Sequence, residues 1–227
     1  MVTLITLHML SSANYDQALG VLKKNTEIAK KAKGFVSRKV VIDIKDRLRG
    51  CSITAFNTAG DLEAFRKNPE RPTLVTQGSQ MFEKTISGNI LVFTKVDVDV
   101  FKTDNEASNS RANPKSWKNR FTQISLHMFD EKNYEQGLNV LRVNTPIASK
   151  QKGFVSRQVY VGIEKPLKGY SVATWETTKD LEYYRTVPGR PEIVHSNDGM
   201  NYLKTSTGLL PVFPHVESGV FQVAHEA

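Results

Sequence analysis

The chain has 227 residues, of which 39% are hydrophobic and 24% are charged, and its formal net charge is +8. This composition is typical of a soluble globular protein and excludes a disordered or low-complexity chain. The single cysteine, Cys51, excludes an internal disulfide and a cysteine-based metal site, so we expect a reducing, cytoplasmic location.

The charge and the hydropathy also bear on partners. No apolar stretch is long enough to span a membrane. Much of the basic excess comes from one lysine-rich segment: Lys23, Lys24, Lys30, Lys31 and Lys33. These lysines flank apolar positions, and no aromatic residues stand between them for base stacking, so we interpret them as a solvated helix face. The sequence therefore predicts neither a nucleic-acid partner nor a membrane partner.

The chain begins with an expected strand and an expected helix. Apolar and polar residues alternate over Val2–Leu10, which is the period of a strand. Apolar residues then recur at three- and four-residue spacing over Tyr15–Ala29, which predicts an amphipathic helix. Gly34 follows at the left-handed position that commonly ends a helix. Two more strands are expected over Phe35–Ile44 and Ser52–Phe56.

A helix, a proline break and a last strand follow. Thr58 stands three residues before Asp61, which is the pattern of a capped helix start. The break is Pro69-Glu70-Arg71-Pro72, and Pro72 predicts the start of another helix. Arg71 is expected to bond nearby carbonyl groups around this break. The closing strand is expected over Asn89–Val96.

The same elements then return in a second copy. Leu7-His8-Met9 is repeated as Leu126-His127-Met128, and Gly34–Arg38 is repeated as Gly153–Arg157, a displacement of 119 positions in both cases (127 − 8 and 153 − 34). A repeat of this length is the size of a small domain. We therefore expect one domain over residues 1–101, a polar linker over 102–120 and a second domain over 121–227.

Prolines mark the places where the second copy should differ. Pro146 interrupts its first helix, over Tyr134–Ala148, and predicts a kink or a restart. Pro211 and Pro214 fall in the last strand and predict an edge or a bulge. Pro191 and Arg190 repeat the roles expected of Pro72 and Arg71.

The element order predicts an α+β fold class with two tandem ferredoxin-like (βαββαβ) domains. Helices on one face of each sheet leave its other face bare, and two copies in one chain can cover each other. We therefore expect the domains to pack sheet to sheet as a pseudo-symmetric dimeric α+β barrel. The chain would form its own pseudo-dimer, with further oligomerisation left open.

Three features resemble the antibiotic biosynthesis monooxygenase superfamily. They are the Gly-Phe-Val-Ser-Arg strand, the third strand ending in Phe56 or Trp175, and the Asp-Leu-Glu helix that follows. Members are dimeric α+β barrels of ferredoxin-like subunits, so the resemblance implies a fused dimer. It also implies a monooxygenase acting on a small aromatic or quinol-type substrate without a bound cofactor. The alternatives are a non-catalytic protein that binds a small hydrophobic ligand or is stress-related, and a heme-binding or heme-degrading protein.

The heme alternative can be tested on the residues. Heme-degrading members use a Trp on the helix after the third strand and a His ten positions later. The corresponding residues are Phe65 and Val75 in the first copy and Tyr184 and Val194 in the second. His195 stands one position beyond, in the second copy only. No other His or carboxylate stands at metal-ligand spacing beside the repeated histidines, so we expect neither a metal nor a bound cofactor.

The candidate catalytic residues are His8, His127, Arg38 and Arg157. The histidines lie on the row opposite Ile5-Leu7-Met9 and its repeat. If that apolar row packs on the helices, the histidines face the barrel lumen, where an imidazole can act as a general base; the alternative is a hydrogen-bonded histidine at the domain join. The arginines lie in an apolar row and can clamp a carboxylate or enolate, with a structural ion pair as the alternative.

The candidate substrate-binding residues are Trp175, Phe56, Tyr184, Phe65 and His195. Phe56 and Trp175 share a row with small residues, which leaves room for a ligand; otherwise they belong to the core. The copies diverge at Phe56 against Trp175, at Thr76 against His195 and at Asp43 against Gly162. This divergence favours one functional cavity and one degenerate cavity.

Overall fold

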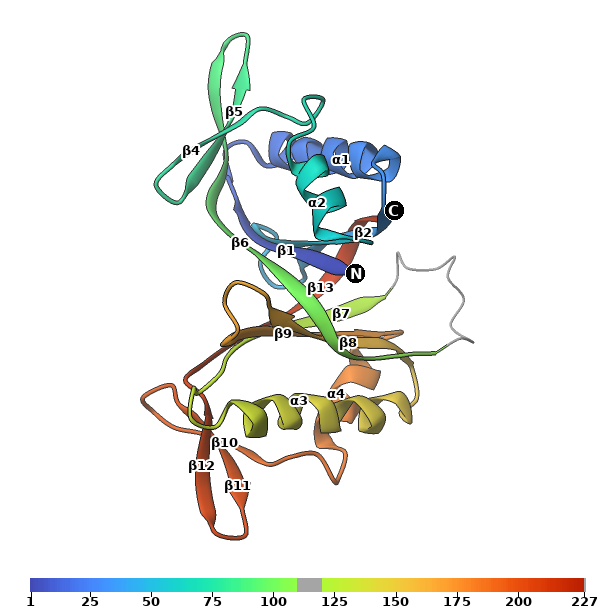
Figure 1. Cartoon of the computed structure of the whole chain (residues 1–227), viewed down its shortest axis with the longest axis vertical. Helices are drawn as coiled ribbons and strands as arrows, with labels where there is room; N and C mark the ends of the chain where they lie inside the picture. The colour runs from blue at the N-terminus through green and yellow to red at the C-terminus, as the bar shows by residue number, and fades with distance from the viewer. Residues whose placement is uncertain (110–119, 227) are drawn as a thin grey trace. The chain divides into compact units, whose positions relative to one another are not determined.

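The structure is a computed structural model that describes residues 1–109 and 120–226. The chain divides into two compact units (Figure 1). The first unit contains Met1–Phe101 and Phe221–Ala227, and the second contains Lys102–Val220. Each unit has an antiparallel sheet with two helices on one face, so the α+β class is confirmed.

The sheet of the first unit is built around β1 (Val2–Leu10). β1 pairs with β3 (Arg49–Phe56) on one side and with β6 (Gly88–Ser108) on the other. β3 pairs in turn with β2 (Phe35–Asp43). The helices α1 (Tyr15–Lys31) and α2 (Ala59–Arg66) cover one face of this sheet (Figure 1).

The second unit repeats this arrangement. Its strands β7, β9 and β8 pair in that order, and its helices are α3 and α4. The bounds are β7 (Phe121–Met128), α3 (Tyr134–Ser149), β8 (Phe154–Gly162), β9 (Lys168–Trp175), α4 (Thr178–Thr186) and β12 (Gly208–Phe213).

The last strand of each repeat continues into the other unit. β6 runs through Phe101 in the first unit, and its remaining residues, 102–108, belong to the second unit, where β6 is the neighbour of β8. β13 (His215–Glu226) does the reverse, since Phe221–Glu226 pairs with β2 of the first unit. Residues 102–108 are therefore strand, although the sequence predicts a linker there. Trp117, which belongs to the predicted linker, lies outside the described residues.

A β-hairpin replaces the helix that the sequence predicts after Pro72. It consists of β4 (Leu74–Gln77) and β5 (Gln80–Thr85) and is followed by β6. The second unit has β10 (Ile193–His195) and β11 (Asn201–Thr205) at the same place. The helix prediction was wrong because the dihedral angle that proline fixes suits an extended segment as well as a first helical turn.

The predictions at the other prolines had mixed outcomes. α3 is one continuous helix across Pro146, so it does not restart there. Pro146 lies in the last turn of α3 and only three helix residues follow it, so the N–H that proline lacks interrupts the hydrogen-bond ladder only near the end of the helix. Pro211 pairs with Tyr202 beside a register shift, and Pro214 separates β12 from β13, which confirms the predicted bulge.

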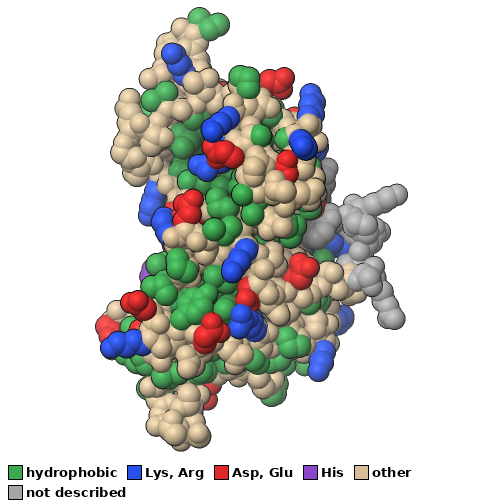
Figure 2. Space-filling view, viewed as in Figure 1, with side chains coloured by type: hydrophobic (Ala, Val, Ile, Leu, Met, Phe, Trp, Pro, Cys, Tyr) green, Lys and Arg blue, Asp and Glu red, His purple; other side chains and the backbone are tan. Residues whose placement is uncertain are grey.

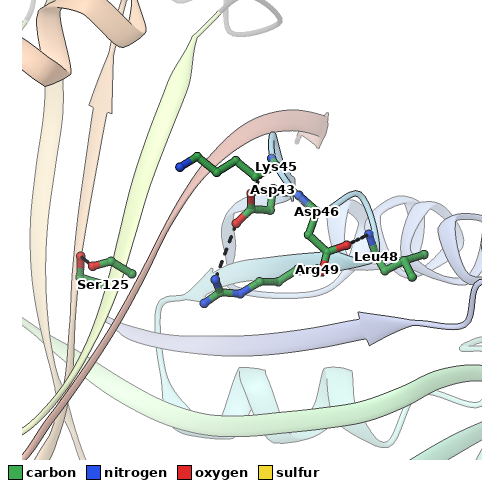
Figure 3. Close-up of polar contacts among 7 residues, drawn as sticks. Asp43, Lys45, Asp46, Leu48, Arg49 and Ser125 are labelled. Carbon is green, nitrogen blue, oxygen red and sulfur yellow. Dashed lines mark hydrogen bonds and ion pairs between the residues drawn. The ribbon is translucent and has the colours of Figure 1, made fainter. Parts of the chain in front are cut away.

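The turn between β2 and β3 explains one difference between the copies (Figure 3). Asp43 Oδ1 accepts a hydrogen bond from the backbone N of Lys45 at 2.8 Å, and Asp43 Oδ2 lies 3.7 Å from Arg49 Nη1. The second copy has Gly162 here, and a Cβ at Gly162 would lie 2.2 Å from the carbonyl oxygen of Lys165. This divergence therefore belongs to turn geometry, and it carries no information about the cavities.

Charged side chains of both signs are interspersed on the face that Figure 2 shows. Lys30, one of the lysines of α1, pairs with Glu27 at 3.2 Å. Among the helices of the described residues, none is long and apolar enough to cross a membrane.

Gly34 occupies a position that two separate constraints reserve for glycine. Its φ is +70°, and a Cβ would lie 2.3 Å from Asp61 Oδ2. Asp61 is the residue whose backbone N donates to Thr58 Oγ1 at 3.1 Å, which confirms the predicted cap of α2. Gly153 and Asp180 repeat this contact in the second unit.

Gly34→Ala is expected to lower the free energy of unfolding by about 2 kcal/mol. About 1 kcal/mol comes from the left-handed backbone, and a similar amount comes from displacing Asp61 at the helix start. The matched control is Gly78→Ala, because Gly78 has φ +61° with nothing near its Cβ position. Urea unfolding measures both variants, and equal losses would show that the contact with Asp61 contributes nothing.

Candidate functional site

Each unit contains a cavity between its sheet and its helices. The first cavity has a volume of about 500 Å³ and the second about 240 Å³. Most of the residues that line the second cavity have repeat counterparts that line the first, and six of these pairs carry the chemistry of the site. They are His8, Asn25, Arg38, Ser52, Phe65 and Arg71 in the first cavity, and His127, Asn144, Arg157, Ser171, Tyr184 and Arg190 in the second.

The histidines lie on the helix-covered face of each sheet, and the prediction had placed them on the opposite face. Leu4 and Leu10 share the row of His8 on β1, and both pack into buried clusters that contain helix residues. The row that faces the helices is therefore apolar at its ends and polar in the middle. Both rows of β1 contain apolar residues, so alternation alone cannot decide which of them packs on the helices.

His8 is a buried, neutral imidazole. Its Nε2 lies 3.1 Å from Ser52 Oγ, and His127 Nε2 lies 3.2 Å from Ser171 Oγ. Nδ1 of each ring is buried without a hydrogen-bond partner among residues 1–109 and 120–226. Burial, and secondarily the charge of Arg38, lowers the pKa of His8 to about 3. Burial and then Arg157 lower the pKa of His127 to about 3 as well. Each imidazole is therefore free to accept a proton at neutral pH, but it is a weak base.

Arg38 is a buried guanidinium held by hydroxyl groups. Its Nε donates to Thr26 Oγ1 at 3.1 Å, and its Nη1 donates to Thr54 Oγ1. Within the described part of the chain it forms no ion pair with a carboxylate, so the structural ion pair that the sequence left open is not found. Burial, followed by repulsion from Arg71, lowers the pKa of Arg38 to about 10, so it stays charged at neutral pH. No acidic residue is among the described residues that line either cavity.

A second arginine lines each cavity. Arg71 Nε donates to Asn25 Oδ1 at 2.9 Å, and its guanidinium lies 4.6 Å from the centre of the Phe65 ring. Arg71 Nη1 also donates to the carbonyl of Arg66 at 2.9 Å, which confirms the expected carbonyl contact. The second unit repeats the arrangement: Arg190 Nε donates to Asn144 Oδ1 at 3.2 Å, and its guanidinium lies 4.5 Å from the Tyr184 ring centre.

The sequence analysis missed Asn25 and Arg71 as cavity residues. The available signal was their identity in both copies, because Asn144 and Arg190 occupy the repeat positions. Polar residues that stay the same while their neighbours drift are candidates for a shared site. Three predicted residues do line the first cavity, His8, Arg38 and Phe65, and four line the second, His127, Arg157, Tyr184 and His195.

Phe56 and Trp175 lie outside both cavities. Both are fully buried in core clusters, where Phe56 packs 5.3 Å from Phe65 and Trp175 stacks 4.9 Å from Tyr184, measured between ring centres. They support the aromatic residue of the cavity wall from behind. Phe56 and Trp175 are therefore core residues, which is the alternative that their sequence pattern left open.

His195 lies on β10 and is exposed at the second cavity. Its Nδ1 forms a hydrogen bond with Asn201 Oδ1. The segment that contains His195 is therefore a strand, although the sequence predicts the start of a helix at Pro191.

The residues do not fit the heme ligand set that the resemblance assigns. In the first unit Phe65 lies on α2, and Val75, at the position of the expected iron ligand, lies on β4 and has no metal donor. In the second unit Tyr184 lies on α4, and Val194 lies on β10 and likewise has no metal donor. Across the described ranges, no group of three or more His, Cys, Asp or Glu could hold a metal ion.

A heme titration of the purified protein is expected to give no saturable shift of the Soret band. The physical reason is that the buried histidines bond to serines and the assigned ligand positions carry no imidazole. Myoglobin apoprotein is the positive control for the heme stock. A saturable one-to-one shift would contradict this reading and would make His195, His127 and His8 the candidate ligands.

Comparisons with known proteins agree with this fold. No protein-family model and no curated protein matches the chain. A putative monooxygenase from Fusobacterium nucleatum has a TM-score of 0.69 at 7% identity, covering 99% of this chain and 93% of that chain. A putative monooxygenase from Lactobacillus acidophilus has a TM-score of 0.64 at 8% identity, with 100% and 95% covered. An anthrone oxidase-like protein has a TM-score of 0.66 at 13% identity, with 100% and 92% covered. The resemblance to the monooxygenase-type ferredoxin fold is therefore confirmed at the level of the fold.

Proposed function

We propose that the chain is a monooxygenase that oxidises a small phenolic, quinol-type or anthrone-type substrate with molecular oxygen and without a bound cofactor. We place the reaction in the first cavity. The carrying observation is that Arg38, a buried cation without a carboxylate partner among the described residues, and the neutral His8 line the same cavity of about 500 Å³. A volume in this range suits a small ligand. The names of the three similar structures support the reaction class.

The proposed first step is ionisation of the substrate. Phenols and anthrones are weak acids, and a fixed positive charge in a site of low dielectric constant stabilises their anions. Arg38 and Arg71 supply that charge, and His8 accepts the proton. Because the pKa of His8 is about 3, its protonation is favourable only next to the substrate anion. The two arginines therefore account for most of the lowering of the substrate's pKa, and the imidazole of His8 accepts the released proton.

The proposed second step is reaction of the anion with oxygen. The substrate carbanion gives an electron to dioxygen, the two radicals join through a new C–O bond, and the resulting peroxide loses water to leave a carbonyl. For an anthrone the balance is anthrone + O₂ → anthraquinone + H₂O. The substrate supplies all four electrons and oxygen accepts them, so the protein needs no redox group of its own.

Oxygen uptake on a panel of anthrones and quinols tests the proposal. We expect one oxygen consumed per substrate and no hydrogen peroxide, so added catalase returns no oxygen. The second candidate function is passive binding of the same compounds, which the weakness of His8 as a base favours. Binding without oxygen uptake across the panel would select that second function.

The packing of the two sheets into an α+β barrel is part of the same proposal. Ile5 and Ile124 lie on the strand rows opposite the cavity rows, on the face away from the helices. An apolar sheet face needs a covering layer, which supports pairing of the two sheets.

A further inference from the structure

The second cavity differs chemically from the first. Three apolar residues that line the first cavity, Leu4, Phe65 and Met81, correspond to Gln123, Tyr184 and Asn201 in the second. His195 adds a further polar group, where the first copy has Thr76. A cavity that merely lost its ligand would be expected to fill with apolar side chains, because buried polar groups without partners are costly. In the second cavity, polar side chains stand where the first cavity has apolar ones.

Arg157, which lines the second cavity, has fewer hydrogen-bond partners than Arg38, its counterpart in the first cavity. Arg38 bonds two threonines, Thr26 and Thr54, whereas Ala173 replaces Thr54 in the second copy. Arg157 Nε is buried and has no hydrogen-bond partner in the part of the chain that the structure describes. Its Nη2 makes only a long bond of 3.5 Å to the carbonyl of Leu141. Arg157 itself is 5% exposed, so its charge lies deep in the unit.

We propose that the second cavity is a separate binding site for a small carboxylate that also carries a hydroxyl group. The planar fork of Nε and Nη2 of Arg157 matches the two oxygens of a carboxylate. Val140, Leu141 and Ile193 provide apolar walls for a short hydrocarbon body. The volume of about 240 Å³ lies below the range of drug-sized ligand sites, about 300–1,000 Å³, which limits the ligand to a small acid.

Polar side chains of the second cavity explain why the proposed ligand carries a hydroxyl group. Tyr184 Oη donates to Asn144 Oδ1 at 3.1 Å and therefore keeps acceptor capacity for a ligand donor. His195 is exposed at this cavity, and its Nδ1 is engaged by Asn201, so its Nε2 can meet the distal end of a ligand whose carboxylate lies on Arg157. In the first cavity Phe65 stands at the position of Tyr184 and Met81 at that of Asn201, and Thr76, the counterpart of His195, is not among the described lining residues.

Titration of the full chain with 4-hydroxycyclohexanecarboxylate tests this site. The probe does not absorb in the near ultraviolet, so calorimetry can be combined with tryptophan fluorescence, and Trp175 reports on the site because it stacks on Tyr184. We expect saturable one-to-one binding and no binding of the neutral 4-hydroxycyclohexanecarboxamide. Arg157→Met should weaken binding about 30-fold or more, and Arg38→Met, the matched change in the first cavity, should leave it unchanged.

A second variant addresses the hydroxyl group. His195→Ala should weaken binding of the hydroxylated probe about fivefold and should leave binding of plain cyclohexanecarboxylate unchanged. If Arg157→Met fails to fold, Arg157→Gln removes the charge and keeps a polar side chain of similar size. Absence of saturable binding, or equal effects of Arg157→Met and Arg38→Met, would overturn the proposal. These titrations involve no oxygen chemistry, so their outcome is independent of the function proposed for the first cavity.

Discussion

Replacing Arg38 with methionine is expected to reduce oxygen uptake by about 100- to 1,000-fold while leaving the chain about as stable as the wild type. Loss of one preorganised group that stabilises a developing anion typically lowers kcat by this factor. Arg38 is the most buried cation of the first cavity, and it has two hydroxyl partners and no carboxylate partner among the described residues. Removing Arg38 therefore removes the positive charge that stabilises the substrate anion.

The stability half of this prediction follows from the cost of burying a charge. Burial and repulsion from Arg71 lower the pKa of Arg38, which means that the folded chain disfavours its charge. Methionine has a similar length and fills the same space without a charge, and such replacements are often neutral or stabilising by about 1 kcal/mol. Thr26 keeps a partner after the change, because its hydroxyl already donates to the carbonyl of Leu22 at 3.0 Å. The buried hydroxyl of Thr54 loses its bond to Arg38, which costs about 1 kcal/mol and offsets the gain.

Oxygen electrode rates and urea unfolding of the same preparations measure both halves. The matched control is Arg157→Met, which makes the identical change in the second cavity and should leave oxygen uptake unchanged. A variant that loses activity and stability together would show that Arg38 is structural. Equal loss of activity in both variants would place the reaction in both cavities rather than in the first.

The fold could be predicted from the sequence because its signals are local and occur twice. The capping threonines, the left-handed glycines and the strand periods each depend on a few neighbouring residues, and the repeat confirms each one. The hairpin after Pro72 could not be predicted in this way, because proline fits both a helix start and an extended chain. The continuation of β6 past Phe101 was also missed, since polar composition suggested a linker where a strand pairs with the other unit.

The site was harder to predict because it depends on which face of a strand packs on the helices. His8 and Arg38 were chosen for their chemistry, and the structure places both in one cavity. The predicted face of the sheet was wrong for His8, because both side-chain rows of β1 contain apolar residues and either could pack on the helices. Phe56 and Trp175 were chosen for their size, but size does not distinguish a residue that lines a cavity from one that supports its wall. Asn25 and Arg71 were missed as cavity residues although both recur in the second copy, because they stand 46 positions apart and only the fold brings their side chains together.

Acidification is expected to destabilise the chain strongly, because both cavity histidines resist protonation in the folded state. The pKa of each is about 3 when folded, against an ordinary value of 6.5. Below pH 6.5 the unfolded chain binds protons that the folded chain cannot bind, so stability falls as the pH falls from 6.5 toward 3. At about 1.4 kcal/mol per histidine per pH unit, the two together remove about 5 kcal/mol by pH 4.5. A loss of this size is comparable to the whole stability of many domains.

Urea unfolding between pH 7 and pH 4.5 measures this effect, and paired variants isolate it from the titration of carboxylates. The double variant His8→Gln with His127→Gln should show a much flatter dependence, because glutamine does not titrate and can still bond to Ser52 or Ser171. His215→Gln is the control, since His215 is exposed and lies in neither cavity. An unchanged slope in the double variant would mean that the two rings are hydrated in the native protein. The single variants then divide the effect between the units, and a smaller share for His127 would indicate that the more polar second cavity shields its histidine less from water.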